Sequence, residues 1–313
     1  MQATRILVIG GSGYVGRELC AALVERGAVV TVPTRGRERA KRDLILLPTV
    51  DVVEADVHDA AALTALAQGQ DAVVNLVGVL HGGSGRQSFD AAHARLGSAV
   101  VDACRQAGVR RLLHMSALNA DPNGPSEYQR SKGRAEAAVK ASGLDWTIFR
   151  PSVIFGRNDA FLNMFAKLVR VLPVVALASP NARFQPVWVG DVVDVMARSL
   201  DDPATIGCSY DLCGPKVYTL RELVAYVGRL TGRPRPIIGL NDTLSYLQAW
   251  TMEWLPVKLM TRDNYYSMKQ DSVCSCPFPF GLTPQSIEAV VPEYLGGAAP
   301  RRRYDRYRGR AHR

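Results

Sequence analysis

The sequence predicts an α/β protein with a doubly wound parallel sheet in its first half and a smaller, mostly helical C-terminal region. Three observations lead to this fold class. Short apolar segments alternate with longer amphipathic ones, glycines follow the amphipathic segments, and the alternation stops after Arg150 and Pro151. The 313 residues are 47% hydrophobic, so the chain can build a large core without disulfides or metals.

The strands and helices can be placed from the apolar pattern. Strands of a parallel sheet are buried on both faces, so each is a short apolar run. Such runs predict strands at residues 5–9, 29–33, 50–54, 72–76, 111–115 and 145–149. Amphipathic segments predict helices at residues 14–26, 59–67, 88–107 and 127–142. The glycines that follow these helices, where a residue with positive φ ends a helix, are Gly27, Gly69, Gly108 and Gly143.

The second half of the chain is less regular and richer in proline. Residues 1–155 are expected to form the sheet domain and residues 156–299 a smaller region. Residues 183–201 predict a strand followed by a helix, which we expect to return to the sheet domain. Residues 300–313, the arginine-rich tail, contain seven arginines and one acidic residue and are expected to be disordered. The tail carries most of the net charge of +9, so no nucleic-acid binding is expected.

The six cysteines lack the paired spacing of a zinc site and predict reduced thiols without a metal. They are Cys20, Cys104, Cys208, Cys213, Cys274 and Cys276. A redox or metal role for the close pair Cys274 and Cys276 is the alternative. The first predicted strand starts at residue 5, which leaves no space for a signal peptide, so a cytoplasmic location is expected. No apolar stretch is long enough to span a bilayer.

A glycine-rich segment, GGSGYVG at residues 10–16, lies between the first predicted strand and the first predicted helix. Gly10 allows a sharp turn, Gly13 lets the backbone approach a pyrophosphate, and Gly16 lets the helix pack on the strand. The helix N-terminus then faces the phosphates with its N–H groups and the positive end of its dipole. This Rossmann pattern predicts binding of a nicotinamide dinucleotide. The predicted contacts are Gly10, Ser12, Gly13, Tyr14, Val15 and Gly16.

The end of the second predicted strand indicates which dinucleotide is bound. An acidic residue there would hold the adenosine ribose of NAD(H), but residues 29–37 contain none. Arg35 stands where a cation would accept the 2′-phosphate of NADP(H). NADP(H) is therefore favoured, and NAD(H) is the alternative. Arg35 could also belong, with Arg37 and Arg39, to a solvated cationic edge of the domain.

Three residues are catalytic candidates. Ser116 follows the fifth predicted strand, and Tyr128 and Lys132 lie on the predicted helix at 127–142. Residues four apart share a helix face, so the Tyr128 hydroxyl and the Lys132 ammonium can reach one site. The cation lowers the pKa of the phenol, which can pass a proton while hydride moves at the nicotinamide, and Ser116 can hold the substrate oxygen. Tyr and Lys at this spacing are also common on helices that carry no site.

Together these motifs resemble the extended and atypical short-chain dehydrogenase/reductases. Residues 150–156, RPSVIFG, are similar to the RPxxVYG segment of that superfamily, whose backbone lies along the nicotinamide. The resemblance implies further cofactor contacts after the third and fourth strands, on the helix and in this segment. These are Asp56, Val57, Gly78, Lys132, Pro151 and Val153. From the residues alone, Asp56 could equally be the N-cap of the next helix.

Within this superfamily the chain resembles the family of the nucleotide-binding accessory subunit of respiratory complex I, alpha-subcomplex subunit nine, and its bacterial relatives. The residues that carry the resemblance are HMSALNA at 114–120, YQRSK at 128–132, FGRNDAFLN at 155–163 and TRDN at 261–264. The family implies an accessory or assembly protein that holds its nucleotide without turning over substrate, with respiratory subunits as partners. The connection from Ser116 to Tyr128 is shorter than in the sugar epimerases and dehydratases, which also favours binding over catalysis.

The alternative function is an NAD(P)-dependent oxidoreductase or epimerase that acts on a carbonyl or alcohol through Ser116, Tyr128 and Lys132. Residues 81–86, HGGSGR, would then be a mobile lid over the substrate, and otherwise a flexible connection.

Residues 241–255 predict a helix with apolar side chains on more than one face. These side chains are Leu244, Leu247, Trp250, Met252 and Trp254. One face can pack on its own domain, so the other predicts docking to a partner or, together with the arginine-rich tail, to an anionic face of the cell membrane. Burial of all these side chains inside the protein is the alternative.

Overall fold

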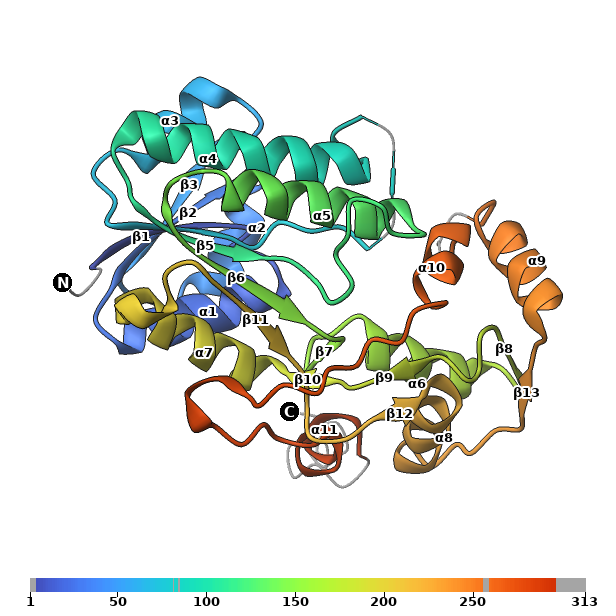
Figure 1. Cartoon of the computed structure of the whole chain (residues 1–313). Coiled ribbons are helices and arrows are strands. Elements are labelled where there is room, and N and C mark those ends of the chain that lie inside the picture. Colours follow the sequence, from blue (N-terminus) through green and yellow to red (C-terminus); the bar gives the residue numbers. More distant parts are fainter. Residues whose placement is uncertain (1–3, 81, 84, 256–258, 297–313) are drawn as a thin grey trace. The chain divides into compact units, whose positions relative to one another are not determined.

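The computed structural model describes residues 4–80, 82–83, 85–255 and 259–296. Its main feature is a seven-stranded sheet in the order β11-β6-β5-β4-β1-β2-β3, in which every pairing is parallel (Figure 1). The strands are β1 (Arg5–Ile9), β2 (Val29–Thr34), β3 (Val50–Glu54), β4 (Ala72–Asn75), β5 (Arg111–Met115), β6 (Asp145–Pro151) and β11 (Cys208–Leu212). The strand order reverses between β1 and β4, which confirms the doubly wound prediction.

Helices cover both faces of this sheet (Figure 1). On one face α3 packs against α4 and α4 against α5, while on the other α1 packs against α7. The helices of this unit are α1 (Tyr14–Glu25), α2 (Arg37–Leu44), α3 (Ala60–Ala67), α4 (Leu96–Ala107), α5 (Glu127–Lys140) and α7 (Val189–Asp201), with short turns η1 (Gly85–Gln87), η3 (Pro203–Thr205) and η4 (Pro279–Gly281). The unit comprises Met1–Pro151, Val189–Leu212 and Cys276–Leu282.

The structure differs from the sequence expectations at two helices of this unit. The segment expected to be one helix at 88–107 begins as a π-helix, η2 (Asp90–Arg95), and continues as α4. Helix α2 had not been expected, because six of its eight residues are charged. It buries only Ala40 and Leu44, so it has too little apolar surface for the pattern to be visible.

The second compact unit comprises Ser152–Trp188, Cys213–Ser275 and the described residues that follow Thr283. Its core is formed by α6, α8 and α11, with buried side chains such as Leu162, Leu223 and Val291. Its helices are α6 (Phe161–Val171), α8 (Leu220–Leu230), α9 (Asp242–Met252), α10 (Arg262–Ser267) and α11 (Ile287–Leu295). Its strands are β7 (Ile154–Phe155), β8 (Val175–Leu177), β9 (Arg183–Phe184), β10 (Val187–Trp188), β12 (Tyr218–Thr219) and β13 (Ile237–Gly239).

The strand expected near residue 187 does not return to the large sheet. β10 pairs with β7 in a two-stranded sheet, and β11 is the strand that borders β6. The error arose because β10 has only two residues and α7 begins directly after it. The apolar pattern runs through both elements, so the segment looked like a longer strand than it is.

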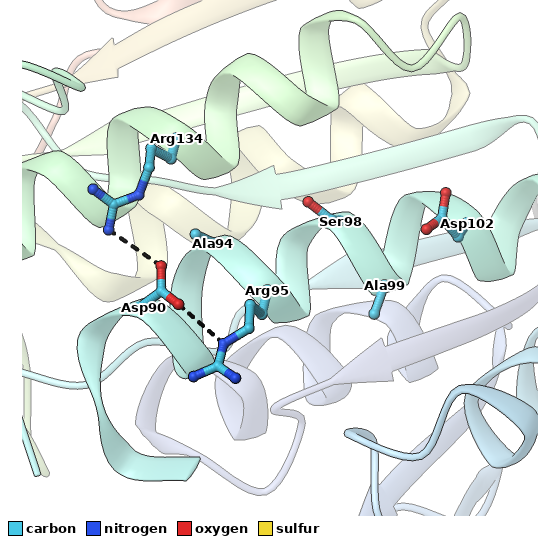
Figure 2. Close-up of a pocket in the computed structure, with 7 residues that line it drawn as sticks. All are labelled: Asp90, Ala94, Arg95, Ser98, Ala99, Asp102 and Arg134. Carbon is cyan, nitrogen blue, oxygen red and sulfur yellow. Dashed lines mark hydrogen bonds and ion pairs between the residues drawn. The ribbon is translucent and has the colours of Figure 1, made fainter. Parts of the chain in front are cut away.

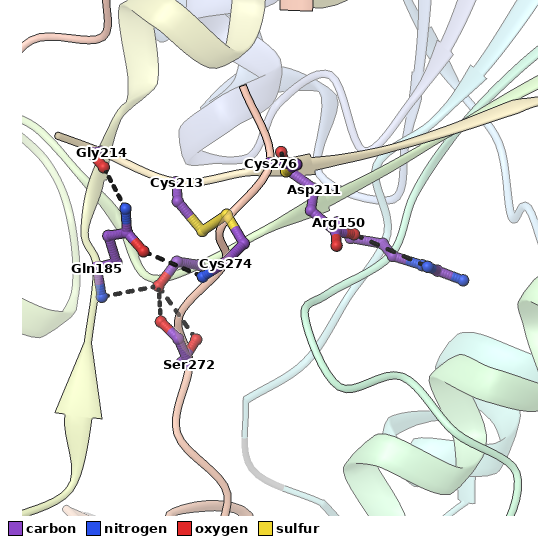
Figure 3. The surroundings of a disulfide bond; sticks show 9 residues. Arg150, Gln185, Asp211, Cys213, Gly214, Ser272, Cys274 and Cys276 are labelled. Atoms are coloured by element: carbon purple, nitrogen blue, oxygen red, sulfur yellow. Dashed lines mark hydrogen bonds and ion pairs between the residues drawn. A yellow bond between two sulfur atoms is a disulfide. The ribbon is translucent and has the colours of Figure 1, made fainter. Parts of the chain in front are cut away.

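The expectation of reduced thiols is wrong for two cysteines, because Cys213 and Cys274 form a disulfide (Figure 3). They are 61 residues apart in the chain. The Gln185 side chain holds both segments together: its amide donates to Gly214 O at 2.7 Å, and its oxygen accepts from Cys274 N–H at 3.0 Å. Cys20, Cys104, Cys208 and Cys276 are free thiols.

Within the described residues, no helix is both long and apolar enough to cross a membrane. In the same part of the chain no three His, Cys, Asp or Glu side chains group as a metal site would require. The arginine-rich tail, expected to be disordered, lies outside the described residues.

Candidate functional site

The glycine-rich segment forms a tight turn between β1 and α1. Gly10 has φ +86°, a conformation that side chains with a Cβ rarely adopt. Gly13 N–H donates to Gly10 O at 2.9 Å and closes the turn. A Cβ on Gly16 would lie 2.3 Å from Gly10 O, so the start of α1 packs directly on the turn. Gly10 and Gly16 therefore shape the turn as the motif requires.

Gly13 is the exposed N-cap of α1, and within the described residues no side chain caps this helix. A Cβ placed on Gly13 would meet Gly10 O at 3.1 Å but would otherwise point into open space. Ser12, Tyr14 and Val15 beside it are partly exposed. Backbone is thus accessible at a helix N-terminus with its positive dipole end, an arrangement that fits the pyrophosphate of a dinucleotide.

Charged side chains gather where β2 and β3 end. Arg35 is exposed, and Asp56 is half-buried and forms an ion pair with Arg86 of η1. The His58 N–H donates to Asp56 at 3.1 Å, and it holds the pKa of this carboxyl below its usual value, helped by the charges of Arg86 and Arg35. Arg86 joins this group from another segment of the chain.

Asp56 is not the N-cap of α3. That position is taken by Asp59, whose carboxylate accepts from Ala61 N–H at 2.9 Å and Ala62 N–H at 3.2 Å. The alternative interpretation of Asp56 as a cap is therefore wrong. Val57 packs against the core of the first unit.

Lys132 and Ser116 lie next to each other at the end of β5. The buried Lys132 Nζ donates to Met115 O at 3.0 Å, and a Cβ on Gly78 would lie 3.3 Å from Nζ. Burial lowers the pKa of Lys132 to about 8, partly opposed by the charge of Glu136. Near neutral pH Lys132 is therefore still largely a cation. It borders the backbone that leaves β4 at Gly78.

Glu136 anchors the same face of α5. Burial acts to raise its pKa, but hydrogen bonds from Arg150, Ser116 and Lys140, together with the charge of Arg150, outweigh burial and lower it. The Arg150 Nε donates to Glu136 Oε1 at 2.8 Å. Glu136 is thus an ionised, paired carboxylate, and it keeps a negative charge near Lys132.

One polar atom of β5, His114 Nε2, remains without a hydrogen bond among the described residues, in a side chain that is only 2% exposed. Asn75 Oδ1 accepts from Val77 N–H at 3.2 Å, so Asn75 Nδ2 donates to His114 Nδ1 at 3.3 Å and the proton of His114 lies on Nε2. Burial lowers the pKa of His114 to about 3, so the ring is neutral. A buried donor without a partner, such as His114 Nε2, fits a site that binds polar groups.

The three catalytic candidates lie in one unit, and the Tyr128 ring lies against two aromatic side chains. Its half-buried ring contacts His93 and Phe89 edge-on, with centroids 5.6 Å and 5.9 Å away. Pro151 ends β6, where its carbonyl accepts from Leu118 N–H at 3.1 Å. Val153 lies in the second unit and packs against the core of that unit.

Comparison with known proteins places these features in a family. A family model described as NAD(P)H-binding matches residues 10–160, which contain the glycine turn, Ser116, Tyr128 and Lys132. Among solved structures, the NADPH-dependent quinone oxidoreductase of Escherichia coli in complex with NADPH has a TM-score of 0.72 to this chain at 18% identity. It covers 93% of this chain and 99% of its own. This likeness shows the fold.

The mitochondrial NADH dehydrogenase (ubiquinone) 1 alpha subcomplex subunit 9 of Mus musculus is 32% identical over 259 residues, which are 78% of this chain and 68% of the mouse protein. The chain belongs to the subunit 9 family. The resemblance drawn from the sequence is thereby confirmed. The present chain is also similar to an enzyme, the (4-alkanoyl-5-oxo-2,5-dihydrofuran-3-yl)methyl phosphate reductase of Streptomyces griseus. That protein is 30% identical over 73% of this chain and 74% of its own length.

The sequence alone assigned no individual role to four residues of this region, which are Asn75, Arg86, His93 and His114. Asn75 and His114 meet because they are register partners on β4 and β5, a pairing that the strand prediction alone does not specify. A buried histidine within an otherwise apolar helical pattern was the available signal for His93. No local signal pointed to the pairing of Arg86 with Asp56.

A pocket of about 430 Å³ lies elsewhere on the first unit, along η2, α4 and α5 (Figure 2). Asp90 in this pocket pairs with Arg95 at 2.9 Å and with Arg134 of α5 at 3.3 Å. Its charged groups are already in ion pairs with residues of the pocket or next to it, so we assign it no ligand. The Asp90–Arg134 pair instead ties the π-helix to α5.

Proposed function

We propose that this subunit 9 relative holds NADP(H) as a bound ligand in its first unit and acts as an accessory or assembly protein of a respiratory NADH dehydrogenase. The observation that supports binding most directly is the turn at Gly10, Gly13 and Gly16, which presents exposed backbone at the uncapped N-terminus of α1. Membership of the subunit 9 family supports the respiratory role, since the mouse relative is named as a subunit of NADH dehydrogenase.

Each part of the dinucleotide has candidate residues in this proposal. The pyrophosphate would lie at residues 10–16, the 2′-phosphate at Arg35, and the adenine near Asp56 and Val57. Gly78 and Lys132 would contact the nicotinamide half, with Pro151 and Val153 along the nicotinamide. The dinucleotide itself supplies hydride chemistry when bound. The chain's own contribution is to bind and orient it.

Exchange of Arg35 for aspartate tests the proposal. Wild type is expected to bind NADPH about tenfold or more tightly than NADH, because a guanidinium makes strong charge-assisted hydrogen bonds to a phosphate. Arg35→Asp is expected to remove that preference, since its carboxylate repels the 2′-phosphate and accepts ribose hydroxyls. Nucleotide fluorescence titration of both proteins with both ligands measures the ratio of the two dissociation constants.

Arg39→Asp is the matched control, because it makes the same charge change on the exposed side of α2. If Arg39→Asp shifts the preference as much as Arg35→Asp does, only a diffuse cationic edge acts on the ligand and the assignment of Arg35 is wrong. A wild-type protein that binds neither nucleotide would refute the binding function itself.

An oxidoreductase is the second candidate function, favoured by one specific observation. Lys132 and Ser116 are adjacent and buried at the end of β5, and Tyr128 is on the same helix as Lys132. The similar Streptomyces griseus protein is named as a reductase. Such a reaction would use Ser116 to hold a carbonyl oxygen and Tyr128 to move a proton to it. We rank this function second because the chain belongs to the subunit 9 family, whose mouse member is named as a subunit of NADH dehydrogenase.

Helix α9 supports a docking surface in the second unit. It buries Ser245 and Ala249, whereas Leu247, Trp250 and Trp254 are 50%, 43% and 79% exposed. The alternative that all the apolar side chains of this segment are internal is therefore wrong. Exposed tryptophans, in a chain that also carries the arginine-rich tail, fit an anionic membrane surface, and we propose that as the occupant.

Fractionation of cells tests this docking. The full chain is expected to pellet with membranes at low salt and to be released by high salt, because each cation near anionic lipid contributes about 1 kcal/mol. A chain that ends at Ala299 and a Trp250→Ser/Trp254→Ser variant are each expected to pellet several-fold less. If the full chain is wholly in the supernatant and copurifies with respiratory subunits, a protein partner replaces the membrane. If it does neither, the docking proposal fails.

A further inference from the structure

His93 lies inside the first unit, in the π-helical segment that directly precedes α4. It belongs to the π-helix η2 and is only 2% exposed. π-helical turns are rare and frequently lie at functional sites. Here the side chain of His93 is aimed between the segment that leaves β4 and the helix α5.

Both ring nitrogens of His93 are hydrogen-bonded, which specifies its tautomer. Val79 N–H donates to Nε2 at 3.0 Å, so Nε2 carries no proton. The proton is on Nδ1, which donates to Ser131 Oγ at 2.8 Å. The Ser131 hydroxyl in turn donates to the carbonyl of Tyr128 at 2.9 Å. A neutral imidazole thus connects the backbone at Val79 to the turn of α5 that begins at Tyr128.

The ring of His93 also contacts two aromatic side chains. It meets the Tyr128 ring at an interplanar angle of 83° with centroids 5.6 Å apart, and the Phe89 ring at 5.9 Å. A Cβ on Gly78 would lie 3.6 Å from His93 Nε2, next to its 3.3 Å approach to Lys132 Nζ. One side chain therefore touches Tyr128 and faces the same backbone that Lys132 borders.

The position of His93 is itself secured from the outer side. Asp90, at the start of η2, pairs with Arg134 of α5 at 3.3 Å (Figure 2). Burial, together with the charge of Lys132, holds the pKa of His93 far below its usual range. The ring is therefore neutral near neutral pH, in agreement with its two hydrogen bonds.

We infer that His93 is a positioning residue of the dinucleotide site, which holds the Gly78–Val79 backbone and the Tyr128 side chain in place for the nicotinamide half of the ligand. The inference rests on the proposed binding function. The inference divides the site into two parts. Residues 10–16 and Arg35 bind the pyrophosphate and the adenosine, whereas His93 affects only the binding of the nicotinamide half. A histidine that merely fills the core would affect both ends alike, through stability.

Two substitutions separate the roles of the ring. His93→Gln carries an amide oxygen to accept from Val79 and an amide NH₂ to donate to Ser131, but no ring. His93→Phe keeps the ring contact with Tyr128 but leaves the Val79 N–H and the Ser131 hydroxyl without this partner. Each variant is titrated by calorimetry with NADPH and with adenosine 2′,5′-bisphosphate, which contains the adenosine half alone. Thermal unfolding without ligand gives the stability of each variant.

The expected result is a split between the two ligands. His93→Phe should weaken NADPH about tenfold, the scale of one lost hydrogen bond, and leave adenosine 2′,5′-bisphosphate within about twofold of wild type. His93→Gln should recover most of the NADPH affinity. Equal weakening of both ligands, or unchanged NADPH binding in His93→Phe, overturns the inference while leaving the binding function intact. If wild type binds neither ligand, the binding function itself has failed.

Discussion

Replacement of Gly13 with valine is expected to abolish dinucleotide binding, with NADPH affinity lower by more than about 100-fold. A Cβ at this position already approaches Gly10 O at 3.1 Å, and the two methyl groups of valine must extend into the open space at the N-terminus of α1. That space is where backbone has to meet the pyrophosphate. Titration with NADPH, together with the ligand-induced rise in melting temperature, measures the loss.

The fold should tolerate this substitution. Gly13 has φ −75° and ψ −179°, an extended conformation that valine adopts readily. Glu18→Val is the matched control, since it adds the same side chain at an exposed position one turn later on α1. It should bind NADPH as wild type does. Retained binding in Gly13→Val, or equal loss in Glu18→Val, would show that the turn is not the pyrophosphate site.

Tyr128→Phe completes the comparison, because it changes the catalytic candidate without blocking the turn. The binding function predicts NADPH affinity within about twofold of wild type, since only one hydroxyl is removed. Substrate-dependent hydride transfer that is present in wild type and lost in Tyr128→Phe would instead place the oxidoreductase function first. Loss of binding in Tyr128→Phe with retention in Gly13→Val would reverse the assignment of the site.

The parts of the fold that the sequence predicts well are those whose cause is local. The bounds of β1, β3 and β5 equal the predicted 5–9, 50–54 and 111–115. β1 and β5 are buried along most of their length, so a short apolar run marks each of them directly. The π-helical start of η2 could not be predicted, since a change in hydrogen-bond register leaves the apolar pattern of residues 88–107 unaltered. The disulfide of Cys213 and Cys274 depends on contacts between segments far apart in the chain.

The candidate site divides in the same way. The glycine turn and the adjacency of Ser116 and Lys132 follow from a general rule, that ligand-binding residues gather at the carboxyl ends of parallel strands. The contacts of His93 with Val79 and Tyr128 follow from no such rule, because they require the relative placement of β4, η2 and α5. The sequence therefore identified the residues of the glycine turn but not His93, whose contacts depend on the tertiary structure.

Exchange of Asp159 for alanine is expected to lower the free energy of unfolding by about 3 kcal/mol. Asp159 belongs to the FGRNDAFLN segment that carries part of the family resemblance, and in the structure it stabilises the start of α6. Its carboxylate is 3% exposed and accepts from Leu162 N–H at 2.6 Å and from Gly156 N–H at 3.3 Å, at the start of α6. The Tyr294 hydroxyl of α11 donates to it at 3.3 Å. Removal of the carboxylate leaves these donors buried without their acceptor.

Asp159→Asn and Asn158→Ala are the controls for this loss. Burial raises the pKa of Asp159 against the opposing hydrogen bonds, so the site favours an uncharged group, and the amide oxygen of asparagine can accept from the same donors. Asp159→Asn is therefore expected to retain more than half of the lost stability, and the exposed Asn158→Ala to change it by less than about 0.5 kcal/mol. Urea unfolding followed by tryptophan fluorescence suits the measurement, because Trp188, Trp250 and Trp254 lie in the same unit as Asp159. An alanine variant as stable as wild type would mean that Asp159 is not needed to hold α6, and that this segment of the resemblance serves another purpose.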